Sequence, residues 1–397
     1  MRRDEELLRR ELAALEDRHG LRRRRLLQAF PQAGNPTRVR LDGRTLINFC
    51  SNDYLGLSHH PALARAQCAA AEQFGAGSGA SHLVSGHSFE HHALEEELAA
   101  FAGRERALLF STGYMANLGA VTALAGRGES VLADRWSHAS LLDAAQLSGA
   151  RLRRYAHADP AAAARACEHD PRVSLIATDG VFSMDGDLAP LPALAALARQ
   201  QGAWLLVDDA HGLGVLGPHG RGTLELQNLD AAQVPILVGT LGKAFGSFGA
   251  FVAGEATLIE YLLQRARSYI YTTALPPAVA AATRAALRLV QSEPWRRERL
   301  RTLIQRFRAA ATGFAARLRP SETPIQPVIV GDAAQTLALS ASLAAAGFFV
   351  AAIRPPTVPA GSARLRITLS AAHTEADVDA LAAELTRLLA AADFATA

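Results

Sequence analysis

Apolar segments of strand length alternate with amphipathic segments of helix length over residues 107–240. The strand-like segments cover residues 107–110, 130–134, 151–155, 173–178, 204–209 and 236–238. Helix-like segments lie between several of them, at residues 140–147, 161–168 and 191–200. Strands that alternate with helices in this way form a mostly parallel sheet with helices on both faces. The pattern therefore predicts an α/β fold.

Polar residues follow these apolar strands at the points where each strand ends. In parallel α/β sheets, ligands bind outside the carboxyl ends of the strands, which lie at one edge of the sheet. The sequence therefore predicts a binding site at that edge. The segments that would line it are 111–114, 134–138, 179–183, 208–211 and 240–243.

The last of these segments opens a glycine-rich loop, Thr240–Gly249, that contains Lys243. Glycines at 242, 246 and 249 allow tight turns and a close approach of the backbone to a ligand. A lysine among small and apolar residues is partly desolvated, which favours its nucleophilic neutral amine. Schiff-base chemistry with an aldehyde cofactor requires such an amine. A surface lysine in a glycine-rich loop remains the alternative from this stretch alone.

Other motifs carry weaker signals. The segment 111–117 places hydroxyls and a glycine at a predicted helix start, which suits a phosphate or a ring. Residues Gly212–Gly217 match the dinucleotide fingerprint, but no acidic residue ends a strand about twenty positions later, so nicotinamide-cofactor binding is disfavoured. His87, Glu90 and His91 have the spacing of a metal-binding helix face; no further ligand pattern supports a metal, and a helix of exposed side chains is expected.

Length and composition set the domain expectations. The chain has 397 residues, 49% of them hydrophobic, enough for two domains and a terminal extension. An amphipathic helical arm is expected at residues 5–25, with Arg22–Arg25 as its solvated end. Residues 40–49 read as a hairpin that turns at Asp42-Gly43. The predicted division is an arm (1–45), a large domain (46–280) and a smaller C-terminal α+β domain (281–397).

Charge and cysteine content exclude several functional classes. The net charge is only +3, which gives nucleic-acid binding little support. Three widely spaced cysteines form no metal motif and fit a reducing cytoplasm. The charged N-terminus lacks the apolar core of a signal peptide. The uncharged runs 107–126 and 333–353 contain hydroxyl, amide and glycine residues, so strand–helix units are expected rather than membrane spans.

Four sequence blocks in the right order resemble the α-oxoamine synthases, a branch of the fold-type I pyridoxal-phosphate enzymes. They are SNDYLGLSHHP (51–61), GVFSMDGD (180–187), VDDAHG (207–212) and PPTVPAGSARLR (355–366), and the resemblance extends from about Leu21 to His373. It implies a fold-type I transferase with a large cofactor-binding domain, a small C-terminal domain and an N-terminal arm. It also implies a homodimer with active sites at the subunit interface.

The resemblance implies pyridoxal 5′-phosphate as cofactor and no metal. Lys243 would hold the cofactor and move protons at the substrate α-carbon. Asp208 would pair with the pyridine nitrogen, His211 would hydrogen-bond the ring oxygen, and His138 would stack over the ring and help orient substrate. The remaining implied cofactor contacts are Gly113, Tyr114, Ser183, Thr240 and, from the partner subunit, Thr272.

For the substrates, the resemblance implies that Arg366 binds the amino-acid carboxylate as a bidentate fork, with Asn52 nearby. Thr357 and Arg22 would contact the acyl substrate; the register of Arg22 within its four arginines is open. The implied reaction condenses L-alanine with a pimeloyl thioester, carried by coenzyme A or an acyl carrier protein, with loss of CO2, in biotin assembly. The residues at positions 184–187 and 355–359 favour this branch of the family.

Two alternatives remain at this point. One is a sister acyltransferase that uses glycine or serine, of the 2-amino-3-ketobutyrate ligase or serine palmitoyltransferase type. The other is a catalytically inactive homologue with a structural or regulatory role. Such a homologue would be expected to lack the lysine or the ring-pairing aspartate, and both Lys243 and Asp208 are present.

Overall fold

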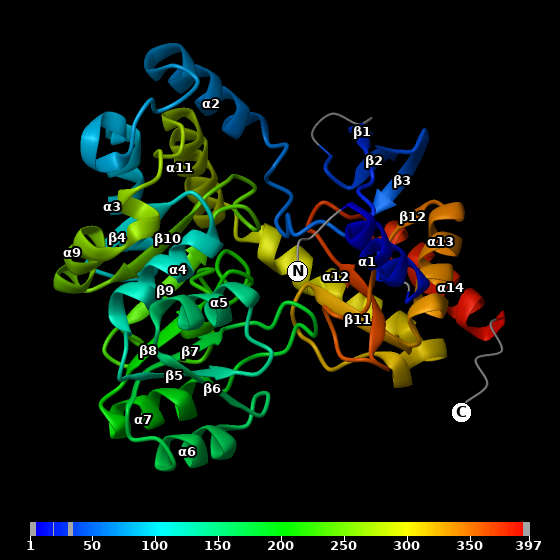
Figure 1. Cartoon of the computed structure of the whole chain (residues 1–397). Helices are drawn as coiled ribbons and strands as arrows, with labels where there is room; N and C mark the ends of the chain where they lie inside the picture. Colours follow the sequence, from blue (N-terminus) through cyan, green and yellow to red (C-terminus); the bar gives the residue numbers. More distant parts are fainter. Residues whose placement is uncertain (1–4, 19, 31–34, 392–397) are drawn as a thin grey trace. The chain divides into compact units, whose positions relative to one another are not determined.

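The computed structural model describes residues 5–18, 20–30 and 35–391, and they form two compact units (Figure 1). Unit 1 comprises the described residues of 1–51, 184–186 and 299–397. Unit 2 comprises residues 52–183 and 187–298.

A seven-stranded sheet forms the centre of unit 2. All of its neighbouring strands are parallel except β10, which is antiparallel to both β4 and β9. The predicted mostly parallel sheet is therefore confirmed. In spatial order its strands are β4 (Arg106–Phe110), β10 (Ala250–Gly254), β9 (Ile236–Thr240), β8 (Trp204–Asp208), β7 (Val173–Asp179), β5 (Ser130–Asp134) and β6 (Arg151–Tyr155).

Helices cover both faces of this sheet, as Figure 1 shows. On one face, Leu175 and Ala177 of β7 join a core that includes residues of α4 (Gly113–Leu124) and α5 (Ala139–Ser148). On the other face, Ile176 joins a core with α6 (Pro160–Glu168) and α7 (Leu191–Gln201). Successive side chains of a strand point to opposite faces, so an apolar run such as β7 fills both cores.

The other helices of unit 2 include an alanine-rich pair. Ala278 and Ala281 of α11 pack against Ala70 of α2, and small side chains allow the two helices to lie close together. Helix α11 thus groups with unit 2, whereas the domain division predicted from the sequence falls at residue 280; that division stays a prediction. The helices are α2 (Pro61–Phe74), the π-helix η1 (His82–Gly86), α3 (Phe89–Ala102), α8 (Thr223–Leu226), α9 (Ala256–Arg265), α10 (Arg267–Ile270) and α11 (Pro277–Ser292).

Unit 1 contains two small sheets, β1-β2-β3-β12 and β11-β14-β13. Its strands are β1 (Leu27–Ala29), β2 (Arg38–Leu41), β3 (Arg44–Asn48), β11 (Ile325–Gly331), β12 (Phe348–Phe349), β13 (Ala351–Ile353) and β14 (Ala363–Thr368). Its helices are α1 (Glu5–Asp17), η2 (Ala311–Arg317, a 3-10 helix), α13 (Ala333–Ala345) and α14 (Glu375–Ala391), together with most of α12 (Trp295–Ala310).

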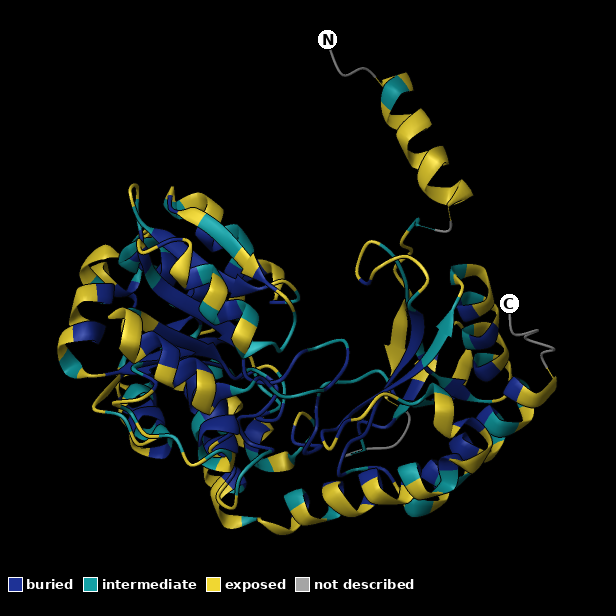
Figure 2. Ribbon diagram, turned by 90° about the horizontal axis from the view of Figure 1, so that it is seen from below, coloured by how far each residue is buried: buried dark blue, intermediate teal, exposed yellow. Residues whose placement is uncertain are grey.

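The N-terminal region confirms one expectation and corrects another. Asp42 and Gly43 turn the chain between β2 and β3 with φ of 51° and 79°, as the predicted hairpin requires. The helix predicted to reach Arg25 ends at Asp17, so the arginine cluster is not a helix end. The backbone N–H groups of Gly20 and Leu21 both donate to the carbonyl of Leu15, in the last turn of the helix. Figure 2 shows α1 exposed along most of its length.

The two long uncharged runs fold as expected. Residues 107–126 form most of β4 and then α4, and residues 333–353 form α13, β12 and β13. Among the described residues, no helix is both long enough and apolar enough to cross a membrane.

Candidate active site

The loop that carries Lys243 is a compact turn between β9 and β10. Gly246 N–H donates to the Lys243 carbonyl at 2.8 Å, and Ser247 N–H donates to the Leu241 carbonyl at 3.0 Å. Gly246 has a φ of 62°, and a Cβ there would lie 2.3 Å from the backbone nitrogen of Ser58. Only glycine fits this position. Lys243 is half-buried, as expected from its apolar neighbours.

Asp208 ends β8, and two hydrogen bonds fix its carboxylate. Asn117 Nδ2 donates to Oδ2 at 2.6 Å, and Ala210 N–H donates to Oδ1 at 3.1 Å. Asn117 projects from the first turns of α4 and is fully buried. Both donors hold the carboxylate in one orientation. A fixed carboxylate at a strand end can pair with a protonated ring nitrogen.

A second carboxyl group lies at the end of the neighbouring strand. Asp179 of β7 is the register partner of Asp208 and is buried. Burial and the nearby Asp208 raise the pKa of Asp179 well above its usual value, although the His138 N–H and the charge of Lys243 act in the opposite direction. Two acidic groups side by side make this end of the sheet a favourable place for a cation.

His138 joins Asp208 through a short chain of hydrogen bonds. Asn117 Nδ2 also donates to Ser140 Oγ at 2.8 Å, and Ser140 Oγ lies 2.7 Å from His138 Nδ1. Since the Ser140 N–H also points at Nδ1, from 3.3 Å, this nitrogen is the acceptor and Nε2 carries the proton. His138 as a whole is exposed.

His211 is oriented by two residues of the 51–61 block. Tyr54 Oη lies 2.7 Å from His211 Nδ1, and its hydroxyl donates to Asn52 Oδ1 at 3.1 Å. Because the one hydroxyl proton goes to Asn52, His211 Nδ1–H donates to Tyr54. Nε2 of His211 is then an acceptor.

The start of α4 offers backbone N–H groups at the same edge. Thr112 caps this helix by accepting from Met115 N–H at 3.2 Å, and Gly113 and Tyr114 are its first residues. Tyr114 Oη donates to Asp143 Oδ2 at 2.5 Å. The Thr240 hydroxyl donates to the Gly249 carbonyl at 3.2 Å. N–H groups at a helix start, with a hydroxyl at a strand end, suit a phosphate.

The remaining predicted site residues divide between the two units. Ser183 and Thr272 are half-buried in unit 2. Arg366 lies on β14 of unit 1 and is buried. Arg22 and Thr357, also in unit 1, are in contact: Arg22 Nη2 donates to Thr357 Oγ1 at 3.2 Å. Of the four adjacent arginines, Arg22 is thus the one that reaches Thr357.

The glycines of the dinucleotide-like motif have packing roles. A Cβ on Gly212 would lie 2.2 Å from Asp209 Oδ1, and one on Gly217 would lie 2.2 Å from Glu225 Oε2. Asp209 is fully buried and accepts from Thr223 N–H at 2.7 Å. Gly212 and Gly217 therefore make room for two carboxylates, of which Asp209 is fully buried, and this accounts for them without a dinucleotide.

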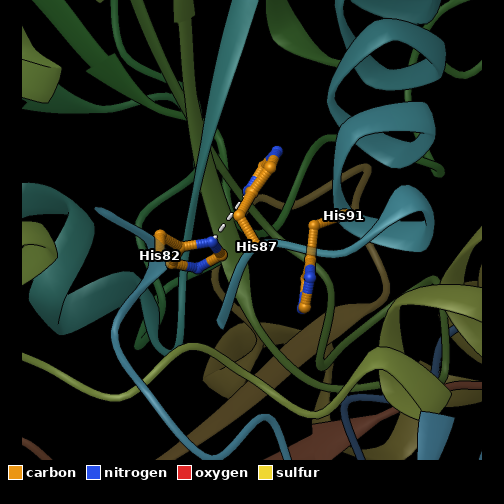
Figure 3. A group of neighbouring side chains, drawn as sticks. All are labelled: His82, His87 and His91. Carbon is orange, nitrogen blue, oxygen red and sulfur yellow. Dashed lines mark hydrogen bonds between the residues drawn. The ribbon is translucent and has the colours of Figure 1, made fainter. Parts of the chain in front are cut away.

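The histidines near the start of α3 differ from the sequence expectation. His91 is fully buried rather than exposed, and His87 precedes the helix, which begins at Phe89. Buried His82 lies beside them, with Nδ1 3.0 Å from His87 Nδ1 (Figure 3). Burial and the neighbouring rings lower the pKa of His82 to about 3, and burial lowers the pKa of His91 and of His87.

Sequence reasoning missed several residues that organise the site. Asn117, Ser140 and Tyr54 were not assigned a role, although each bonds a predicted site residue or its partner. One signal was available for Asn117, which is an amide in the otherwise apolar helical segment GYMANLGAVTAL. A buried amide in such a helix needs polar partners.

Comparison with known proteins shows which family the chain belongs to. The model of the family described as aminotransferase class I and II matches residues 44–385. The chain belongs to the aminotransferase class I and II family. Among curated members, it is 62% identical over 371 residues to the 8-amino-7-oxononanoate synthase of Methylococcus capsulatus, covering 93% of this chain and 95% of that protein. It is 59% identical over 361 residues to the enzyme of the same name from Pseudomonas putida, covering 91% and 92%.

Two solved structures agree with the fold. A Sphingomonas wittichii serine palmitoyltransferase superposes with a TM-score of 0.88 at 32% identity, covering 98% of this chain and 97% of that one. The 8-amino-7-oxononanoate synthase of Francisella tularensis superposes with a TM-score of 0.77 at 32% identity, covering 87% and 98%. The predicted fold-type I transferase architecture is confirmed.

Proposed function

We propose that this chain is a pyridoxal-phosphate-dependent acyltransferase that condenses L-alanine with a pimeloyl thioester. The products are 8-amino-7-oxononanoate, CO2 and the free carrier thiol, a step of biotin biosynthesis. The observation that carries this proposal is 62% identity, over 93% of the chain, to a protein named 8-amino-7-oxononanoate synthase. The solved structures named serine palmitoyltransferase and 8-amino-7-oxononanoate synthase are both 32% identical and do not separate the branches, whereas the curated relatives at 59% and 62% identity are named 8-amino-7-oxononanoate synthase. The glycine- or serine-using alternative is therefore less favoured.

The residues at the strand ends fit pyridoxal phosphate. The two carboxyl groups of Asp179 and Asp208 suit a ring with a protonated nitrogen, and Asn117 fixes the carboxylate of Asp208. The N-terminus of α4 suits the phosphate. Lys243 is half-buried at the end of the next strand. When bound, the cofactor supplies an aldehyde for an amine and an electron sink for charge that develops at the amino-acid α-carbon.

The chain's own residues then have distinct tasks. Lys243 would take the α-proton of alanine and return a proton at the same carbon. Asp208, oriented by Asn117 and Ala210, would pair with the protonated ring nitrogen. His211, with Nδ1–H directed at Tyr54, would accept a hydrogen bond at Nε2 from the ring oxygen. His138, with Nε2–H exposed, would stack on the ring and orient the carboxylate of the substrate.

In the net reaction, the alanine α-carbon forms a bond to the thioester carbonyl carbon and the carrier thiolate leaves. The alanine carboxyl group departs as CO2, and a proton replaces it at the α-carbon. We infer that Arg366 binds the alanine carboxylate and that Asn52 assists. The paired Arg22 and Thr357 would contact the acyl chain or its carrier. Gly113, Tyr114, Ser183, Thr240 and Thr272 complete the proposed cofactor contacts.

We also infer a homodimer in the cytoplasm. Large apolar side chains are exposed at and around η1, namely Leu83, Val84, Phe89 and Tyr271. Contiguous exposed apolar surface is typical of subunit interfaces. Thr272 lies in this region, since its neighbour Thr273 pairs with Ser81, which supports its proposed contact with the cofactor of the partner subunit. The three cysteines are free thiols, which suits a reducing compartment.

A competition experiment tests the function. The protein is incubated with pyridoxal phosphate, pimeloyl-coenzyme A and equal amounts of L-alanine, glycine and L-serine, and the products are identified by mass spectrometry. The proposal predicts 8-amino-7-oxononanoate as the main ketone and none from Lys243→Ala. A ketone derived mainly from glycine or serine would assign the chain to a sister branch. Absence of any ketone, with the pimeloyl group on coenzyme A or on an acyl carrier protein, would overturn the proposal.

A further inference from the structure

A second cluster of polar side chains lies where η1 meets α3. It contains His82 of η1, His87 between the two helices, and His91, His92 and Glu95 of α3. Two overlapping groups of three have ligand atoms within 4.8 Å of one another: His82, His87 and His91, and His87, His92 and Glu95. The two groups share His87. The hydrogen bonds of His91 and His87 show which group can bind a cation.

Both ring nitrogens of His91 already take part in hydrogen bonds within the protein. Its Nδ1 accepts from the Ser88 N–H at 3.0 Å, which closes the cap of α3. Its Nε2 lies 2.6 Å from the Leu275 carbonyl, to which it must donate. Neither nitrogen is available to a cation without loss of a buried hydrogen bond, so the first group lacks a third ligand.

His87 is oriented for the second group. Figure 3 shows its ring meeting that of His82, with the two Nδ1 atoms 3.0 Å apart. One of these nitrogens must carry the proton. If His87 donates, its Nε2 presents a lone pair, and this atom lies 3.9 Å from Glu95 Oε2. His82 cannot turn away easily because it is buried and stacks on Tyr269 at a centroid distance of 4.9 Å.

Glu95 is held in a matching orientation. Its Oε1 accepts from the Leu109 N–H at 2.9 Å, which leaves Oε2 directed toward His87. His92 lies on the same helix face, three residues before Glu95. Its side chain is 64% exposed, and its Nε2 lies 3.5 Å from Glu96 Oε1 at the surface. A ligand atom of His92 already lies within 4.8 Å of those of His87 and Glu95, so a cation would draw it from an exposed pair with Glu96.

We propose that His87, His92 and Glu95 bind one divalent cation of the zinc type. Two imidazoles and one carboxylate are a common zinc donor set with a fourth position open to water. Ligand distances of about 2.1 Å place tetrahedral donor atoms roughly 3.4 Å apart, so the 3.9 Å between His87 and Glu95 needs only a small adjustment. His82 would act as the outer partner that orients His87. The cation would join the residues between η1 and α3 to the first turns of α3.

Zinc titration of the holoenzyme tests this site, with thermal stability as a second readout. Neither readout depends on turnover, so the result is independent of the proposed reaction. All variants carry Cys68→Ser, because Cys68 is an exposed thiol that could bind zinc. We expect one equivalent of Zn2+ per chain and a rise in the melting temperature. Affinity should fall at least tenfold in His87→Gln and in His92→Gln, and should be unchanged in His169→Gln, a matched exposed histidine on the end of α6.

His82→Phe gives a further check. It keeps an aromatic ring beside Tyr269 but removes the acceptor for His87, so zinc affinity should fall about 10- to 100-fold while the stoichiometry stays at one. Absence of saturable binding to the parent protein would overturn the proposal. So would equal affinity in the parent protein and in both His87→Gln and His92→Gln.

Discussion

Asn117 and Asp208 are 91 residues apart in the sequence, and the amide of the first donates to the carboxylate of the second at 2.6 Å. The bond connects a helix start to a strand end. It holds one carboxylate oxygen in place and, through Ser140, extends to His138. One buried amide thus organises two residues that are proposed to contact the cofactor ring.

Replacing Asn117 should therefore weaken the cofactor site. A hydrogen bond to a charged group contributes about 1.5–3 kcal/mol, so Asn117→Ala should raise the dissociation constant for pyridoxal phosphate roughly 10- to 100-fold. Absorbance titration of the apoprotein measures this change. Asn117→Asp should be worse, because it places a third carboxyl group beside Asp179 and Asp208. Unchanged affinity in both variants, with native circular dichroism, would contradict the role given to Asn117.

Gly212 should be essential for packing. Its Cβ would lie 2.2 Å from Oδ1 and 2.8 Å from Cγ of buried Asp209, which the Thr223 N–H holds in place. Overpacking of this kind costs about 1–3 kcal/mol. Gly212→Ala should lower the melting temperature by several degrees. Gly77→Ala is the matched control, since a Cβ there meets nothing within 4 Å. Equal melting temperatures for the two variants would show that Asp209 can move.

His157 should make the stability of the protein depend on pH. Burial disfavours its charged form, but hydrogen bonds to Asp134 at 3.1 Å and Asp187 at 2.7 Å prevail and raise its pKa to about 9. In the unfolded chain, the pKa of a histidine is about 6.5. The charged ring therefore contributes its full stabilisation below pH 6.5, and this is lost as the pH rises through about 9. After allowance for solvent screening, we expect roughly 1–2 kcal/mol.

Thermal or urea unfolding between pH 6 and pH 10 checks this prediction. The parent protein should lose stability over that range, and His157→Gln should be less stable at pH 6 but should show a flatter profile. His169→Gln, at an exposed histidine, should follow the parent curve. If the stability of the parent protein and of His157→Gln changed with pH in the same way, the predicted ion pairing of charged His157 with Asp134 and Asp187 would be wrong.

Arg22 should affect acyl-substrate binding more than its neighbours. It is the member of the arginine cluster whose guanidinium reaches Thr357. If this pair contacts the acyl thioester, Arg22→Ala should raise the KM for that substrate about 3- to 10-fold, with a small effect on kcat, as expected for one exposed charged contact. Arg24→Ala, also at an exposed position, is the control. Steady-state kinetics with varied pimeloyl-coenzyme A measures both. An equal effect of the two substitutions would mean that only the net charge matters.

The parallel sheet and its binding edge were predictable because both depend on local patterns. Each apolar strand is bounded by polar residues, and Asp208 and Lys243 stand at strand ends in the sequence itself. The position of β10 was not predictable in the same way. Its antiparallel pairing with β4 joins segments about 140 residues apart, and strand order depends on such long-range packing.

Side-chain networks were the least predictable part of the site. The bonds of Tyr54 to His211 and of Asn117 to Asp208 join segments that no sequence spacing relates. The histidines at α3 show a different limit. Their spacing suggested one helix face, but the helix begins at Phe89, so His87 meets His82 instead, and His91 is used to cap the helix. A shift of two residues in a helix start changed which side chains are neighbours.

The loop of Lys243 begins and ends on a register pair, because Thr240 of β9 faces Ala250 of β10. Because the sheet fixes both ends of this loop, the loop can adopt few conformations in the folded protein. The entropic cost of placing the lysine amine is therefore met when the protein folds, not each time a substrate arrives. In this sense the sheet preorganises the reactive group, and lengthening the loop by even one residue should slow the reaction before it destabilises the fold.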